Sequence, residues 1–139
     1  MEQPIARLTF RKEERLCSKI AIEKLFSSGT TFFISPVKVL VLKSASLAPA
    51  PVKVLISVPK KYLRHATDRN RMKRLLREAY RRKKQLLIKN LNLSDYEYTV
   101  ALIFTRKQLV EFNVIENVID RILQQILDGE KSSNHPSLK

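Results

Sequence analysis

Residues 67–89 read TDRNRMKRLLREAYRRKKQLLIK, and this stretch decides the fold. Neither glycine nor proline interrupts it, and most of its residues favour helix. We expect one long helix, with Thr67 or Asp68 capping the free amides of its first turn. Apolar residues recur every three or four positions and predict a stripe that packs on a core. They are Met72, Leu75, Leu76, Ala79, Leu86 and Leu87.

The other side of this predicted helix is polar and mostly basic. Its residues follow one another about one turn apart. They are Asn70, Lys73, Arg74, Arg77, Arg81 and Lys84. A solvated helix face normally mixes charge signs, because like charges one turn apart repel each other. After Asp68 the stretch holds a single acid, Glu78. Such a concentration of cations indicates a polyanionic partner, and nucleic acid is the natural candidate.

The composition agrees with this interpretation. The chain has 139 residues, a net charge of +14 and a pI of about 10.2, with an ordinary hydrophobic fraction of 44%. We expect one domain over residues 1–129, followed by a disordered polar tail over 130–139. Phosphate contacts would relieve the self-repulsion that so high a charge creates. The length and charge therefore favour a small domain that binds nucleic acid.

Several other classes of function are disfavoured. The two glycines form no phosphate-binding GxxxxGK[ST] loop. The single cysteine, Cys17, allows no internal disulfide, and no Cys–His cluster has the spacing of a zinc site. The longest apolar runs are shorter than the roughly 18–20 residues that a membrane span needs. We therefore expect no membrane partner, no metal site and a cytoplasmic location.

The remaining segments predict an α+β domain of order α-β-β-β-α-β-α, built as a two-layer or partly three-layer sandwich. Ser18 caps a first helix that ends at Gly29, and Gly129 ends the last one. The predicted helices span 18–28, 67–89 and 111–128, and the predicted strands span 31–34, 36–43, 52–58 and 96–105. We expect strands 36–43 and 52–58 to pair as a hairpin. The strands on either side of the long helix would be parallel neighbours.

The second and third predicted strands alternate, so each has two different faces. One face is purely aliphatic and should pack on helices. The opposite face carries Lys38 and Lys53 and should be less completely covered. A lysine in this position is either solvated or available to a phosphate backbone.

Two motifs together carry a resemblance to a known family. The strand end Ser57-Val58-Pro59-Lys60-Lys61 is followed by Arg69-Asn70-Arg71-Met72-Lys73-Arg74-Leu75-Leu76-Arg77-Glu78. This combination closely resembles the protein subunit of bacterial ribonuclease P, whose signature is an Arg-Asn-Arg helix followed by Lys-Arg and Arg-Glu. The resemblance covers residues 8–128. It implies a small α/β sandwich similar to a ribosomal-protein domain, with a left-handed β-α-β crossover around the basic helix.

The resemblance also implies a function and partners. The protein would be the non-catalytic subunit of an endoribonuclease whose catalytic RNA uses Mg²⁺ to hydrolyse the phosphodiester bond 5′ to the mature tRNA. Its partners would be ribonuclease P RNA and precursor tRNA, and the protein would be monomeric on its own. The scattered acids and isolated histidines of this chain agree, since they offer no acid–base pair for hydrolysis by the protein itself.

The family's functional positions can be transferred to this sequence. Contacts with the RNA subunit would come from Arg69, Asn70, Arg71, Lys73, Arg74 and Arg77, with Lys60 and Lys61 extending the positive surface. Glu78 would orient Arg74 or Arg82. The precursor's 5′ leader would lie in a cleft between the first helix and the open sheet face. That cleft would be lined by Ile22, Phe26, Lys38, Leu40 and Lys53.

This chain departs from the pattern of the family that it resembles within the cleft. Relatives often have an aromatic residue at the positions of Ile22 and Leu40, whereas Phe26 is retained. We therefore expect leader binding that is electrostatic and weakly selective for sequence. Two other hypotheses fit the charge: a ribosomal-type structural RNA-binding protein, and a DNA-binding protein with its basic helix in the major groove.

Overall fold

The computed structural model describes residue 15 and residues 18–46 and 51–133. Cys17, residues 47–50 and residues 134–139 of the predicted tail lie outside the described residues. The α+β class is confirmed. The elements are α1 (Lys19–Ser28), β1 (Thr30–Ile34), β2 (Val37–Ala45), β3 (Lys53–Ser57), α2 (Ala66–Lys83), α3 (Gln85–Asn90), β4 (Tyr96–Phe104) and α4 (Phe112–Ser133).

The four strands form one mixed sheet in the order β1-β2-β4-β3. The parallel pairing of β3 with β4, across the helical connection, is confirmed. The predicted hairpin of β2 with β3 is wrong, because β4 lies between them and pairs with β2 antiparallel. Both β2 and β4 are nine residues long and pair along their whole length. Alternation determined the two faces of each strand, but it carried no information about which strand lies beside it.

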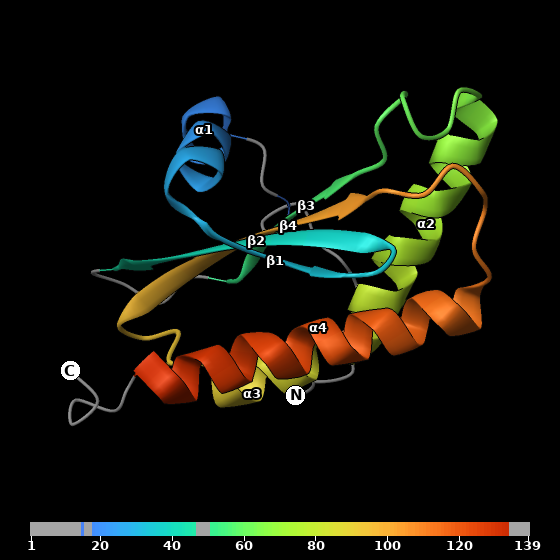
Figure 1. Cartoon of the computed structure of the whole chain (residues 1–139). Helices are drawn as coiled ribbons and strands as arrows, with labels where there is room; N and C mark the ends of the chain where they lie inside the picture. The colour runs from blue at the N-terminus through green and yellow to red at the C-terminus, as the bar shows by residue number, and fades with distance from the viewer. Residues whose placement is uncertain (1–14, 16–17, 47–50, 134–139) are drawn as a thin grey trace, which may run out of the picture.

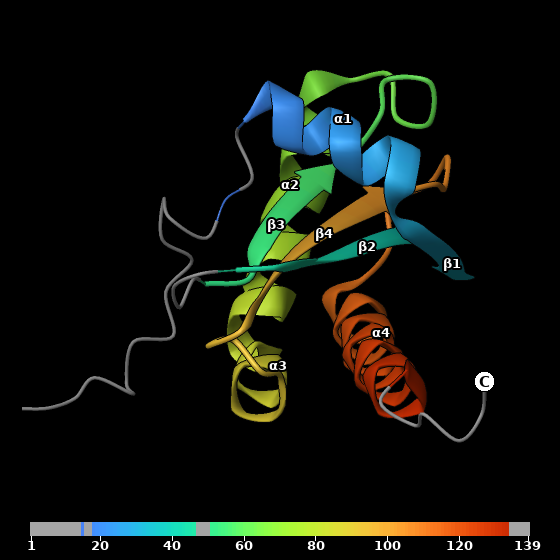
Figure 2. The ribbon, with the colours of Figure 1, turned by 90° about the vertical axis from the view of Figure 1, so that its left-hand side faces the viewer.

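The sheet separates two helical layers, as Figures 1 and 2 show. Helix α1 lies on one face, and α2 and α4 cover the other. The main core lies on the α2 and α4 side and includes Val39, Val54 and Val100 from the sheet. A smaller cluster under α1 is centred on Leu25 and Leu40. The predicted division of the strands into two faces is therefore confirmed.

The long basic helix differs in detail from its prediction. It begins one residue after His65, whose side chain makes no capping hydrogen bond, so neither Thr67 nor Asp68 is the cap. Asp68 lies instead in the first turn, where a carboxylate interacts favourably with the helix dipole. The helix ends at Lys83, and the short α3 follows it. Lys84 lies at this junction and is only 4% exposed, so it does not belong to the exposed basic face.

The last helix continues through Gly129 to Ser133, contrary to the prediction that Gly129 ends it. Glu130, in the extension, accepts hydrogen bonds from the Lys43 ammonium at 2.8 Å and from the Tyr98 hydroxyl at 3.0 Å. These contacts tie the end of α4 to β2 and β4. The first helix matches its prediction closely, because the Ser18 side chain accepts a bond from the Ala21 amide and Gly29 caps the other end.

Candidate nucleic-acid interface

Helix α2 is held on the core by four buried side chains. They are Met72, Leu76, Ala79 and Tyr80. On its outer side, Asn70, Arg71, Arg74 and Arg77 are exposed and Lys73 is half-buried. We call these five residues the α2 surface. Within the part of the chain that the structure describes, no carboxylate lies within 4 Å of these cations. The structure thus brings the predicted residues together as a positive surface that is not neutralised.

The carboxylates near α2 pair with cations further along the helix. Glu78 accepts a hydrogen bond from Arg81 Nε at 2.9 Å, and this contact lowers the pKa of Glu78. The predicted partners of Glu78, Arg74 and Arg82, are therefore wrong. Arg82 is 3.4 Å from Glu116, and Lys83 Nζ is 3.9 Å from Asp120. The last two pairs join α2 to α4, so the acids lie beside the C-terminal half of α2.

Arg69 has a structural contact that the sequence did not reveal. Its Nη1 donates to the backbone oxygens of Leu63 at 3.0 Å and Arg64 at 2.7 Å. These bonds attach the loop between β3 and α2 to the first turn of the helix. A guanidinium group has five N–H donors, so the contact leaves others for an RNA phosphate. Arg69 therefore fixes the position of the loop that continues the positive surface.

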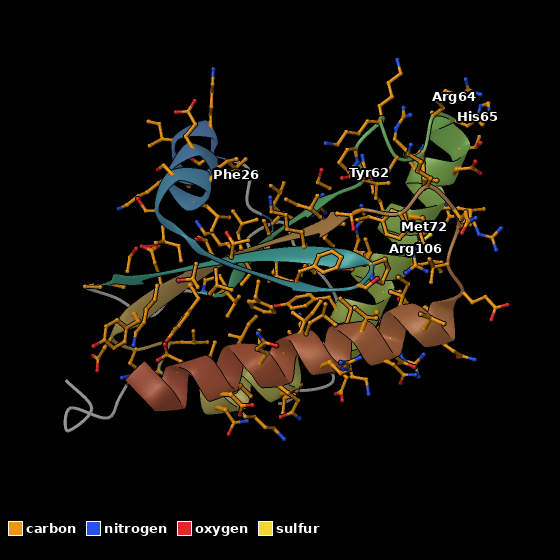
Figure 3. All side chains as sticks on the ribbon, in the orientation of Figure 1. Phe26, Tyr62, Arg64, His65, Met72 and Arg106 are labelled. Atoms are coloured by element: carbon orange, nitrogen blue, oxygen red, sulfur yellow. The ribbon has the colours of Figure 1, made fainter. Side chains whose placement is uncertain are left out.

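That loop carries the two lysines of the family motif. Lys60 and Lys61 are both exposed, and Lys61 Nζ lies 5.1 Å from the centroid of the Tyr62 ring. Figure 3 shows Arg64 and His65 at the outer end of α2 and Tyr62 in the loop before it. A hollow of about 370 Å³ opens here. It is lined by Lys61, Tyr62, Leu63, Arg64, His65, Asp68 and Lys107. The basic character of α2 thus extends around its N-terminal end.

The predicted leader cleft is altered by the way α1 packs. Leu40 is only 3% exposed and forms a small core with Leu25 and Ala101, so it cannot line an open cleft. Ile22 is half-buried against the same cluster. Phe26, near the sheet in the last turns of α1, remains 50% exposed (Figure 3). Of the predicted hydrophobic residues of the cleft, Phe26 is the most accessible to a ligand.

Two lysines of the predicted cleft lie apart from each other. Lys38 is paired in register with Ile103 of β4, whereas Lys53 is paired with Thr99. Ile103 and Thr99 are four residues apart on β4, so the positions of the two lysines are separated by roughly 13 Å along the strand direction. The buried row of Leu40 and Ala101 lies between them, under α1. Lys38 is exposed and Lys53 half-buried, so the two lysines serve different parts of this face.

One row of the open face contains a residue that sequence reasoning missed. Phe33, Lys38, Ile103 and Ser57 lie opposite one another in register across β1, β2, β4 and β3. We call these four residues the open row. Phe33 is 57% exposed, whereas its neighbours Phe32 and Ile34 pack against the main core. Alternation within the predicted strand 31–34 could have separated Phe33 from them, but its place beside Lys38 needed the register.

No helix within residues 18–46 and 51–133 combines the length and apolar character of a membrane span. The histidines and acids of the same residues form no group of three or more with the geometry to hold a metal ion.

The ribonuclease P family model matches residues 10–127. The ribonuclease P protein component of Porphyromonas gingivalis is 34% identical over 122 residues, which cover 88% of this chain and 89% of the relative. That of Chlorobium phaeobacteroides is 34% identical over 129 residues, covering 85% and 88%.

Solved structures agree on the fold. The ribonuclease P protein of Thermotoga maritima gives a TM-score of 0.63 at 23% identity and covers 81% of this chain and 96% of its own. The Staphylococcus aureus protein gives 0.60 at 20% identity, covering 83% and 96%. The chain therefore belongs to the ribonuclease P protein family, and its role is that of the non-catalytic protein subunit of this tRNA-processing enzyme.

Proposed function

We propose that the chain binds the catalytic RNA of ribonuclease P through the α2 surface, extended by Arg69, Lys60 and Lys61, and the precursor's 5′ leader through the open sheet face. The observation that carries this proposal is the charge of Arg71, Lys73, Arg74 and Arg77, which no carboxylate of the described residues compensates within 4 Å. A guanidinium group can bind phosphate with two parallel hydrogen bonds, and Asn70 can bond backbone or sugar hydroxyls. These residue types suit a folded RNA better than a protein surface.

The protein's contribution to cleavage is charge and position. The described residues offer no cluster that suits a metal ion, so the proposal leaves Mg²⁺ with the RNA subunit. Cations of the protein neutralise phosphates that otherwise require more Mg²⁺ or salt to approach one another. The protein acts in the cytoplasm, and it is a monomer until it joins the RNA.

The leader contacts are divided between two sides of α1. Phe26 and Lys38 are exposed, and Lys53 is half-buried further along the face. Lysines at these positions bind the leader's phosphates without reading its bases. Ile22 and Leu40 support α1 on the sheet and do not touch the leader.

The test is reconstitution of the enzyme. The protein is mixed with its cognate catalytic RNA and a precursor tRNA at low Mg²⁺, and 5′ cleavage is measured with and without it. Stimulation of correct cleavage is the expected result. A protein that binds the RNA but gives no stimulation at any Mg²⁺ concentration would instead support a ribosomal-type structural role.

The same assay tests the surface. A variant with Arg71, Arg74 and Arg77 changed to glutamine should require more Mg²⁺ than the wild type. Because that variant removes three charges, the matched comparison is between the single variants Arg74→Gln and Arg121→Gln. Arg121 is an exposed arginine on α4, away from the α2 surface, and Arg121→Gln should behave as the wild type. Equal loss in the two single variants would show that the total charge, and not the α2 surface, is responsible.

A further inference from the structure

We infer that Glu116 and Asp120 of α4 determine which RNAs the chain accepts, because they hold Arg82 and Lys83 and so limit the positive surface to the N-terminal half of α2. The two acids are positioning residues, since they act through the cations that they hold and not through a contact with RNA. The inference rests on the proposed function, because it concerns the selectivity of the α2 surface for the catalytic RNA.

The first argument is the distribution of charge along α2. The α2 surface lies within residues 70–77, and among the residues that the structure describes no carboxylate lies within 4 Å of its cations. The next three cations along the helix each pair with one acid. The pairs are Arg81 with Glu78, Arg82 with Glu116, and Lys83 with Asp120. The same helix therefore carries cations of two kinds, and the boundary lies after Arg77.

The second argument is the geometry of the two pairs that join α2 to α4. Arg82 Nε lies 3.4 Å from a carboxylate oxygen of Glu116, and the guanidinium carbon lies 5.5 Å from the centroid of the Phe112 ring. Lys83 Nζ lies 3.9 Å from Asp120. The side chains of Arg82 and Lys83 are still 50% and 37% exposed. Both cations would therefore be accessible to a phosphate if the acids did not hold them.

The third argument is that stability does not account for these acids. Both helices contribute to the main core, with Met72 and Leu76 from α2 and Ile115 and Ile119 from α4. Exposed ion pairs add little to such a contact. The acids also oppose the charge of the chain, because residues 111–130 hold five acids and one arginine in a protein of net charge +14. Acids placed here lower the attraction for RNA in general, which is how an interface rejects unwanted partners.

The consequence of the pairing is a short binding surface. Residues 70–77 correspond to roughly 12 Å of helix, and an extension to Lys83 would add about 9 Å. Phosphate contacts position a protein without reading sequence, so a longer positive surface would bind any RNA duplex more tightly and in more than one register. A short surface requires a partner whose own fold places its phosphates. It therefore favours a folded catalytic RNA over an ordinary duplex.

The experiment compares binding of the full chain to its cognate catalytic RNA and to an RNA duplex of arbitrary sequence, over a range of salt concentrations. The acid double variant, Glu116→Gln with Asp120→Asn, should bind the duplex roughly tenfold more tightly than the wild type. Its salt slope on the duplex should rise by roughly 0.7–0.9 for each released cation. Its affinity for the catalytic RNA should change by less than about threefold, so the preference for that RNA falls.

Two further variants separate the pairs from the total charge. Glu111→Gln with Asp128→Asn is the matched control, because it removes the same charge from exposed acids that form no ion pair within the described part of the chain. It should keep the wild-type preference. Adding Arg82→Gln and Lys83→Gln to the acid double variant should return the duplex affinity to the wild-type value, since the released cations are then absent.

Wild-type affinity of the acid double variant for the duplex would overturn the inference. An equal gain in the matched control would also overturn it, as would a gain that persists after Arg82 and Lys83 are replaced. Thermal melts show whether each variant is folded. If the acid double variant is not, Glu116→Gln and Asp120→Asn decide singly, each with about half of the rise in slope. The proposed function is tested separately by Arg74→Gln, because wild-type affinity of that variant for the catalytic RNA would refute the α2 surface whatever the acids do.

Discussion

Glu78 accepts its hydrogen bonds from Arg81, three residues further along α2, and Arg74 on the preceding turn has no carboxylate partner in the described part of the chain. Glu78 is therefore paired within α2, one turn beyond Arg74. The two other acids beside this helix, Glu116 and Asp120 of α4, pair with Arg82 and Lys83 near its C-terminal end. The N-terminal half of α2 keeps its charge for an external anion.

Arg69 should contribute to stability as well as to RNA binding. Its two bonds to the Leu63 and Arg64 carbonyls hold the loop before α2, and a charged hydrogen bond of this kind contributes about 1 kcal/mol or more. We expect Arg69→Ala to lower the free energy of unfolding by about that amount in urea titrations. Arg69→Lys keeps the charge, but its side chain is one atom shorter and does not bring an N–H donor to the position of Nη1, so it should be destabilised too. Wild-type stability in both variants would show that the two bonds are not maintained in solution.

Phe26 should distinguish precursor from mature tRNA. Its ring is half exposed near the sheet, in the last turns of α1. We expect Phe26→Ala to weaken holoenzyme binding of precursor tRNA roughly tenfold while binding of mature tRNA stays the same. If both substrates were weakened equally, Phe26 would act through the packing of α1. A thermal melt of the free variant serves as the control for folding.

Gly129 should be replaceable with a gain in stability. It lies inside α4, and a Cβ atom built there meets nothing within 4 Å. Glycine in a helix interior is less favourable than alanine by roughly 0.5–1 kcal/mol. Gly129→Ala should raise the free energy of unfolding by up to that amount, measured by urea titration. A loss of stability would mean that the chain leaves the helical conformation near this residue.

Tyr98 should make stability sensitive to alkaline pH. Burial of the phenol, followed by its hydrogen bond to the negatively charged Glu130, raises the pKa of Tyr98 well above the ordinary value of about 10. The stabilising effect is complete below about pH 10, where the unfolded phenol is also protonated. It is lost as the pH rises above that value, because the unfolded state releases its proton first.

The measurement is the melting temperature between neutral and strongly alkaline pH, for the wild type and for Tyr98→Phe. The wild type should lose stability more steeply above about pH 10, since the phenylalanine has no proton to release. Parallel curves would show that Tyr98 ionises equally easily in the folded protein.

Local patterns predicted the helices and strands because each depends on neighbouring residues. The alternation of Val39 and Leu40 assigned both strand faces correctly, and the cationic side of α2 was visible in its spacing. The insertion of β4 between β2 and β3 was not predictable, since pairing over long sequence distances depends on the whole topology. The prediction that the last helix ends at Gly129 was wrong because Glu130 bonds to Lys43 and Tyr98, which are distant from it in sequence. These contacts hold the helix beyond Gly129.

The candidate site was likewise predictable only in part. Predicting the α2 surface required only the helical repeat, so its residues were predicted together. Predicting the leader face required the position of α1 on the sheet and the pairing of the strands, because α1 buries Leu40 and the register places Lys38 apart from Lys53. The exposure of Phe33 beside Lys38 needed the register of β1 with β2.

The most direct test of the central claim is the salt dependence of binding to the catalytic RNA. The logarithm of the affinity should fall linearly with the logarithm of salt concentration, by roughly 0.7–0.9 for each phosphate contact. Arg71→Ala and Lys73→Ala should each reduce the slope by about one such contact, whereas Arg121→Ala on α4 should leave it unchanged. An unchanged slope in both α2 variants would contradict the account, because it would remove this helix from the RNA interface.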